Sequence, residues 1–269
     1  MDALPHFETL LLTRQGRLLT LTLNRPDALN AFNLQMHDEL PEALIFARSD
    51  AGSDVLLLTG AGRAFSAGGD LDHIARNAAN PELFDHEVDQ ARRIITTLMD
   101  IDKPVICRMN GHAVGLGATI ALFCDIIFAQ SQAKIGDPHV ALGLVAGDGG
   151  AIIWPALIGA ARAKEYLLTG ELLSAERAAA IGLINHALST DALDEAVIAS
   201  VARLLAGAQF AIRATKRLAN AELKRLVAAQ LDAGLELERQ SVRTADHREG
   251  VAALKEKRTP KFGKGSEHN

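Results

Sequence analysis

Two glycine-rich turns have the composition needed to hold an oxyanion through backbone N–H groups. They are residues 62–71 (GRAFSAGGDL) and residues 110–119 (NGHAVGLGAT), and each follows a short apolar run. Glycine tolerates backbone angles that expose amides, and the unpaired amides at a helix N-terminus favour negative charge. Two such turns facing each other would hold an oxyanion between two N–H groups. Each turn alone is equally compatible with an ordinary connection between a strand and a helix.

A histidine and an aspartate, His139 and Asp148, stand nine residues apart in a third glycine-rich segment, residues 135–150. A neutral imidazole can accept a proton near pH 7, and a carboxylate on its other nitrogen would fix the tautomer. The pair could therefore act as a general base. The simpler alternative is a structural histidine, with Asp148 as the cap of a helix that begins near Ala151.

Short apolar segments alternate with helical ones over the first two thirds of the chain. Residues 18–23 alternate Leu with Thr, which is typical of a half-buried strand. Continuous apolar runs, typical of strands covered on both faces, occupy residues 55–59, 104–109 and 125–129. Residues 31–48 and the segment after the second turn predict helices. This alternation predicts an α/β class with mostly parallel strands.

The last third differs, because no strand is predicted after about residue 191 and residues 208–237 carry Leu and Ile at helical spacing. We therefore divide the chain into an α/β core that holds the site, residues 1–195, and a helical C-terminal region, residues 196–269.

Composition excludes several classes of protein. The 269 residues include 28 Lys and Arg against 33 Asp and Glu, a net charge of −5, which argues against a nucleic acid or an anionic membrane as partner. The longest uncharged stretch, residues 110–124, is too short to span a bilayer, and residues 1–15 lack the pattern of a signal peptide. Cys107 and Cys124 lie in apolar sequence, which indicates buried thiols rather than a disulfide or a metal site. We expect a cytoplasmic protein without a bound metal.

Five segments, taken in order, resemble the crotonase superfamily, also called the enoyl-CoA hydratase/isomerase family. Each segment alone is degenerate, but together they cover nearly the whole chain and are highly specific. They are residues 23–33 (LNRPDALNAFN), 62–71, 110–129 (NGHAVGLGATIALFCDIIFA), 168–185 (LTGELLSAERAAAIGLIN) and 247–262 (HREGVAALKEKRTPKF).

The resemblance implies a crotonase-like fold, a spiral of ββα turns followed by a helical region that builds a homotrimer or a hexamer made of two trimers. It implies acyl-CoA thioesters as substrates, with coenzyme A as part of the substrate and no bound cofactor. The oxyanion-hole amides of the family fall on Gly69 and Leu116. The substrate and CoA contacts that it implies fall on Ala28, Leu29, Ala67, Asp70, Leu71 and Lys257, although Asp70 could equally cap the following helix.

The chain departs from the family at the two glutamates of its hydratases, whose positions hold Thr119 and His139. A threonine cannot act as a carboxylate acid or base at neutral pH, so the two-glutamate addition of water cannot be carried over. The second glutamate, which the isomerases need, is also absent. His139 and Asp148 with this spacing resemble the carbon–carbon bond hydrolases of the superfamily, in which the pair activates water to cleave a β-diketone and an enolate leaves.

Three functions therefore remain open. The first is an enoyl-CoA hydratase/isomerase-like lyase that runs enolate chemistry with His139 and Asp148. The second is a β-diketone hydrolase that uses the same pair, and the third is a non-catalytic paralogue. Among the other residues considered, we expect His112 to be structural, and Phe65 and Trp154 to lie in the core. Either His73 or His86 could face the acyl group, but we expect both to lie on the surface.

Overall fold

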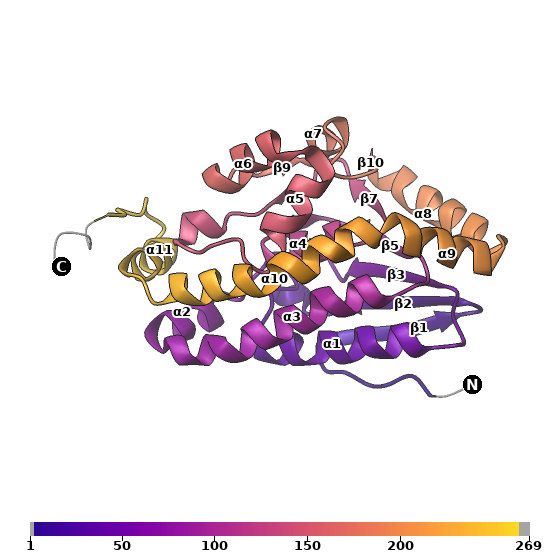
Figure 1. Ribbon diagram of the computed structural model, residues 1–269, viewed down its shortest axis with the longest axis horizontal. Coiled ribbons are helices and arrows are strands. Elements are labelled where there is room, and N and C mark those ends of the chain that lie inside the picture. Colours follow the sequence, from indigo (N-terminus) through magenta and orange to yellow (C-terminus); the bar gives the residue numbers. More distant parts are fainter. Residues whose placement is uncertain (1–2, 264–269) are drawn as a thin grey trace.

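Six strands form the larger of two sheets in the computed structural model, which describes residues 3–263 (Figure 1). Their order in the sheet is β1-β2-β3-β5-β7-β10; β1 and β2 pair antiparallel and all other neighbours pair parallel. The bounds are β1 (Leu10–Gln15), β2 (Leu18–Leu23), β3 (Val55–Gly60), β5 (Val105–Met109), β7 (Ile126–Gln130) and β10 (His186–Leu188). The four predicted strands and their mostly parallel pairing are confirmed.

A smaller sheet of four short strands positions the site. Its order is β4 (Ala64–Ser66), β6 (His112–Val114), β8 (Lys134–Gly136) and β9 (Leu173–Ser174), and the first three pair parallel. Strands β4, β6 and β8 follow β3, β5 and β7 after a few residues. Each successive turn of the chain's spiral therefore contains two strands before a helix. This is the predicted ββα spiral. Because β4, β6 and β8 are parallel, the residues after their carboxyl ends meet at one edge, the usual place for a ligand.

Seven described α-helices belong to the part of the chain before residue 190. They are α1 (Leu34–Ser49), α2 (Leu71–Ala79), α3 (Phe84–Asp100), α4 (Leu116–Leu122), α5 (Gly150–Ile158), α6 (Ala160–Thr169) and α7 (Ala175–Ala180). Three short 3₁₀ helices join them, η1 (Pro26–Ala28), η2 (Pro81–Leu83) and η3 (His139–Leu142). The helix predicted at residues 31–48 is α1, which begins later because Asn33 caps it by accepting a hydrogen bond from the Met36 N–H.

The C-terminal third is helical throughout its described residues, as predicted. It consists of α8 (Thr190–Leu205), α9 (Gln209–Ala219), α10 (Ala221–Val242) and α11 (Ala245–Lys255). The boundary predicted at residue 195 falls inside α8, which packs Leu193, Val197 and Val201 against the large sheet. Figure 1 shows α10 running alongside α3. The last residues of the predicted C-terminal region, 264–269, lie outside the described residues.

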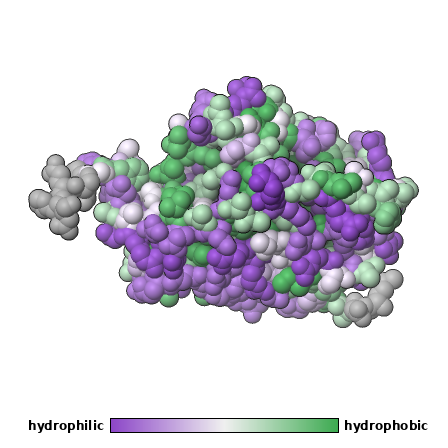
Figure 2. All heavy atoms as spheres, viewed as in Figure 1, coloured by the Kyte–Doolittle hydropathy of each residue, from purple (hydrophilic) through white to green (hydrophobic). Residues whose placement is uncertain are grey.

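The core is built mainly from aliphatic side chains. Phe65 and Trp154 are fully buried, as expected, and Cys107 and Cys124 are buried free thiols. In the face drawn in Figure 2, hydrophilic residues dominate over α2 and α3. Exposed large apolar residues elsewhere include Leu168, Ile198, Phe210 and Leu218. Their exposure is compatible with the predicted trimer, which stays a prediction.

No single helix within residues 3–263 is long and apolar enough to cross a membrane. Helices α8 and α9 reach the necessary length and apolar composition only when taken together, and a bend of 109° separates them.

Candidate active site

The two glycine-rich turns lie against each other at the ends of β4 and β6. A Cβ atom on Gly68, whose φ is +85°, would lie only 2.8 Å from the carbonyl oxygen of Val114. Gly69 follows directly, and Leu116 is the first residue of α4, where helix geometry leaves its N–H unpaired. Neither the Gly69 N–H nor the Leu116 N–H donates a hydrogen bond to any described residue. Both predicted oxyanion-hole donors are therefore free to bind a ligand.

The predicted CoA-binding segment lies beside the first turn. Leu29 and Asn30 both have positive φ, and the Asn30 side chain holds this conformation by donating to the carbonyl oxygens of Ala61 and Ala64. The Ala67 N–H donates to the Leu29 carbonyl oxygen at 3.0 Å. Ala67 and the neighbouring Ala28–Leu29 backbone are thus brought together, as a shared CoA site requires.

Asp70 serves as a helix cap rather than a free substrate ligand. Its Oδ1 accepts hydrogen bonds from the N–H groups of Asp72 and His73 at the start of α2, and its Oδ2 lies 3.1 Å from Arg25 Nη2. The alternative that we weighed for this residue is the one that the structure shows. The side chain of Leu71, in contrast, is half exposed at the cavity described next.

A cavity of about 500 Å³ opens at the edge where β4, β6 and β8 end. Six of the predicted site residues line it: Ala67, Gly69, Leu71, Leu116, His139 and Asp148. Four others do not: Ala28, Leu29, Asp70 and Lys257. Lys257 is exposed just after α11, next to Arg258, which does line the cavity.

His139 follows β8 and contacts three carboxylates. Its Nδ1 is hydrogen-bonded to Asp137 Oδ1, while its Nε2 lies 3.7 Å from Asp148 Oδ2 and 3.8 Å from Glu238 Oε1. We expected Asp148 to form the hydrogen bond that orients the ring, and this was wrong. Asp137 takes that place because it is two residues away on the same turn, where its Oδ1 also accepts from the His139 N–H.

The three carboxylates determine the charge of the imidazole. Burial alone would lower the pKa of His139, but the negative charges of Asp137, Asp148 and Glu238 outweigh burial and raise it well above its usual value. This shift favours the imidazolium, whereas we expected a neutral base. Burial also raises the pKa of Asp148, and it raises that of Glu238 well above the ordinary range.

Comparison with known proteins identifies the family. The family described as enoyl-CoA hydratase/isomerase matches residues 13–265. The chain belongs to this family. Among its relatives, 1,2-epoxyphenylacetyl-CoA isomerase of Escherichia coli K12 is 37% identical over 247 residues, 91% of this chain and 94% of the relative. The 2,3-dehydroadipyl-CoA hydratase of the same organism is 34% identical over 94% of this chain and 98% of the relative.

Solved structures agree with this assignment. The crystal structure of an enoyl-CoA hydratase/isomerase from Mycobacterium paratuberculosis is 40% identical and matches with a TM-score of 0.88. The match covers 92% of this chain and 99% of that chain.

For a member of the enoyl-CoA hydratase/isomerase family, the position of Thr119 is informative. Its hydroxyl donates to Asp148 Oδ1 at 3.2 Å, and the same oxygen accepts from the N–H of Gly150, the first residue of α5. One oxygen of Asp148 thus binds the start of the helix, while the other faces His139. The helix-cap interpretation of Asp148 is therefore met, and a carboxylate lies beside the position where threonine stands.

Glu238 is a site residue that sequence reasoning missed. It comes from α10, is only 4% exposed, and its Oε2 has no hydrogen-bond partner among the described residues. A Cβ atom on Gly147 would lie 2.2 Å from the carbonyl oxygen of Gly234 and 2.8 Å from Glu238 Cβ, so this glycine lets α10 approach the loop after β8. No local pattern marks a contact between residues so far apart in the sequence.

The other histidines separate into cavity and surface groups. His73 is buried and lines the cavity, so the surface position that we expected for it was wrong. His86 is exposed and bonded to Asp38, as expected. His112 has the expected structural role, because its Nδ1 accepts from the Lys134 N–H at 2.9 Å.

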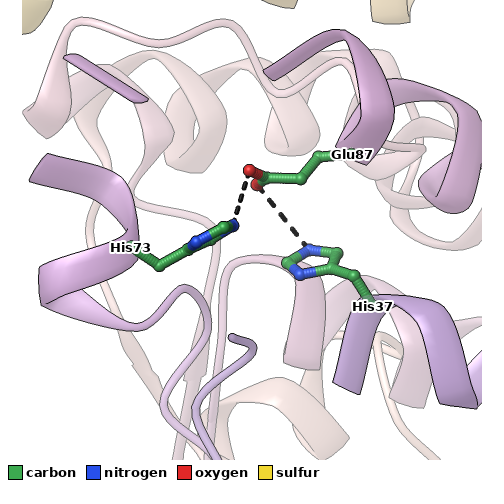
Figure 3. A group of neighbouring side chains, drawn as sticks. All are labelled: His37, His73 and Glu87. Atoms are coloured by element: carbon green, nitrogen blue, oxygen red, sulfur yellow. Dashed lines mark ion pairs between the residues drawn. The ribbon is translucent and has the colours of Figure 1, made fainter. Parts of the chain in front are cut away.

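His37, on α1, was not considered and also lines the cavity. It lies with His73 and Glu87 in a buried group drawn in Figure 3. This group and the group of Asp137, His139 and Asp148 each place three possible metal-ligating atoms within 4.8 Å of one another.

Proposed function

We propose that the chain acts on an acyl-CoA thioester and stabilises its enolate, as an enoyl-CoA hydratase/isomerase-like lyase. The thioester oxygen binds between the N–H groups of Gly69 and Leu116, and the acyl group enters the cavity. The observation that carries this proposal is that both amides are unpaired on adjoining turns, beside His139 and Asp148. Fixed donors aimed at a developing negative charge contribute strongly to catalysis.

His139 and Asp148 move the protons in this proposal. In hydration, Asp148 takes a proton from a water molecule as the water oxygen bonds to the β-carbon and the electron pair of the double bond moves toward the thioester. The resulting enolate then takes a proton at its α-carbon from the imidazolium of His139, and the proton held by Asp148 returns to His139. The net result is the addition of water across the double bond. Asp137 holds the ring through Nδ1, so Nε2 faces the reacting atoms.

Loss of the double-bond absorbance of crotonyl-CoA tests the proposal directly. We expect His139→Gln to lower kcat by about 10²–10⁴-fold, because an acid–base group is lost. Binding of the CoA ester should change little, since the oxyanion turns remain. His86→Gln, an exposed histidine outside the cavity, is the matched control and should retain activity. Hydration that survives His139→Gln unchanged would contradict this role.

A β-diketone hydrolase is the second candidate, and the imidazole–carboxylate pair of His139 and Asp148 in one cavity favours it. A cyclic β-diketone without CoA, tested in the same series, separates the two. Ring cleavage without hydration of crotonyl-CoA would assign the hydrolase. Binding of CoA esters without turnover of either substrate would assign a non-catalytic paralogue.

A further inference from the structure

A second polar group lies in the cavity, apart from His139 and its carboxylates. It consists of His37 on α1, His73 on α2 and Glu87 on α3, whose side chains converge from three helices (Figure 3). All three are less than a tenth exposed. His73 Nε2 lies 2.6 Å from Glu87 Oε1, and His37 Nε2 lies 3.9 Å from Glu87 Oε2. The mechanism described above uses none of them.

Hydrogen-bond partners define what each side chain offers to a ligand. His37 Nδ1 lies 3.0 Å from the Asn33 carbonyl oxygen, which can only accept, so Nδ1 carries the proton and Nε2 offers a lone pair. Burial lowers the pKa of His37, which keeps this ring neutral. His73 is the opposite, because its Nδ1 faces Arg76 Nη2 at 3.2 Å and a guanidinium can only donate. His73 Nε2 therefore carries the proton.

Three polar atoms of the group have no hydrogen-bond partner among the described residues. His73 Nε2 forms no hydrogen bond within residues 3–263, although it lies 2.6 Å from Glu87 Oε1 as an ion pair. The gap of 3.9 Å between His37 Nε2 and Glu87 Oε2 is too long for a direct hydrogen bond. It accommodates one oxygen atom at about 2.8 Å from each. Asn77 already donates to the other oxygen of Glu87.

This combination of one free donor and two free acceptors selects the ligand. A carboxylate or a keto group only accepts, and a carboxylate would also face Glu87. An ammonium group only donates, and it would face the N–H of His73. The proton on His73 Nε2 likewise occupies the position that a metal ion would need. A hydroxyl group both donates and accepts, so it can accept from His73 Nε2 and donate to one of the two acceptors.

We propose that the group of His37, His73 and Glu87 binds a hydroxyl on the acyl part of the substrate. The preferred substrates are then hydroxylated acyl-CoA esters rather than plain hydrocarbon chains. The hydroxyl accepts from His73 Nε2 and donates to His37 Nε2 or to Glu87 Oε2. This inference rests on the proposed function, because it assumes that a CoA ester enters the cavity.

The test compares matched pairs of CoA esters by isothermal titration calorimetry. The pairs are saturated acyl-CoA esters of increasing chain length, each with and without a terminal hydroxyl. For the pair whose hydroxyl reaches the group, we expect the hydroxylated ester to bind about 10- to 100-fold more tightly, since its absence leaves buried polar atoms unpaired. His37→Leu and His73→Leu should remove this preference while the plain ester still binds, which also shows that the variants fold. His86→Leu, on the outside of α3, should keep it.

Equal affinity within every pair would overturn the inference while leaving the proposed function intact. A preference that persists in both His37→Leu and His73→Leu would also overturn it, because the hydroxyl would then bind elsewhere. Stoichiometric binding of zinc that both variants abolish, without any preference for hydroxylated esters, would assign the group to a metal instead. If neither member of any pair binds, the proposed function itself fails.

Discussion

Replacing Asp148 by Asn removes one of the three negative charges around His139 and keeps the shape of the side chain. The Oδ2 of Asp148 lies 3.7 Å from His139 Nε2. With an effective dielectric constant of about 20, a charge at this distance contributes about 4 kcal/mol. That corresponds to at most about 3 pKa units. Because Asp137 and Glu238 remain, we expect the pKa of His139 to fall by about 1–3 units.

Titration of ¹³C-labelled histidine by NMR measures this change without any substrate. The His139 signal is assigned by its absence in His139→Gln. Hydration of crotonyl-CoA supplies a second readout, and we expect kcat to drop by about 10²–10⁴-fold because the acceptor for the proton of water is lost. Any residual activity that needs the imidazolium should decline at lower pH than in the unmodified protein.

Asp38→Asn is the matched control, because Asp38 is bonded to the exposed His86 outside the cavity. It should leave the pKa of His139 unchanged. An unchanged pKa of His139 in Asp148→Asn would refute the reasoning, since it would mean that the Asp148 carboxylate does not stabilise the imidazolium.

Three further predictions concern the turns, a buried lysine and the assembly. Gly68→Ala places a Cβ atom 2.8 Å from the Val114 carbonyl oxygen; the turns should separate, and kcat/KM for crotonyl-CoA should fall by about 10²–10³-fold with the circular dichroism spectrum retained. Burial lowers the pKa of Lys103 to about 8 from 10.5, so the unfolded chain binds more protons between these values and the free energy of unfolding should rise with pH across this window. Urea denaturation should show this rise in the unmodified protein and not in Lys103→Met. Light scattering should give a trimer or a hexamer, and a monomer at micromolar concentration would contradict the predicted assembly.

The sequence predicted the parts of the site that depend on local pattern. Glycines after apolar strands located both glycine-rich turns, and parallel strands brought them to one edge. Asp137 was overlooked because it lies in the same short segment as Asp148, separated from the histidine only by Pro138. Only the path of the turn decides which of the two carboxylates reaches the ring.

Residues on separate helices could not be predicted in the same way. His37, His73 and Glu87 meet because α1, α2 and α3 converge on the cavity, and each side chain alone is compatible with a solvent-exposed helix. The position of Glu238 depends on the close approach of Gly147 to Gly234, a contact with no local signature. The raised pKa of His139 depends on its buried acidic neighbours, and a neutral base was expected because the sequence does not show that Asp137 and Glu238 lie beside the ring.

The passage of α10 and α11 along the cavity has a consequence for the order in which the protein matures. Leu235 and Glu238 from α10, with five residues between 250 and 260 in and after α11, complete a cavity whose other walls are made from the first 150 residues. During synthesis, the ribosome releases the sheet and both oxyanion turns long before these helices. A nascent chain therefore contains the unpaired amides, His139 and Asp148 before it contains Glu238 and the wall that α10 and α11 supply. The cavity is therefore complete only when the last helices dock.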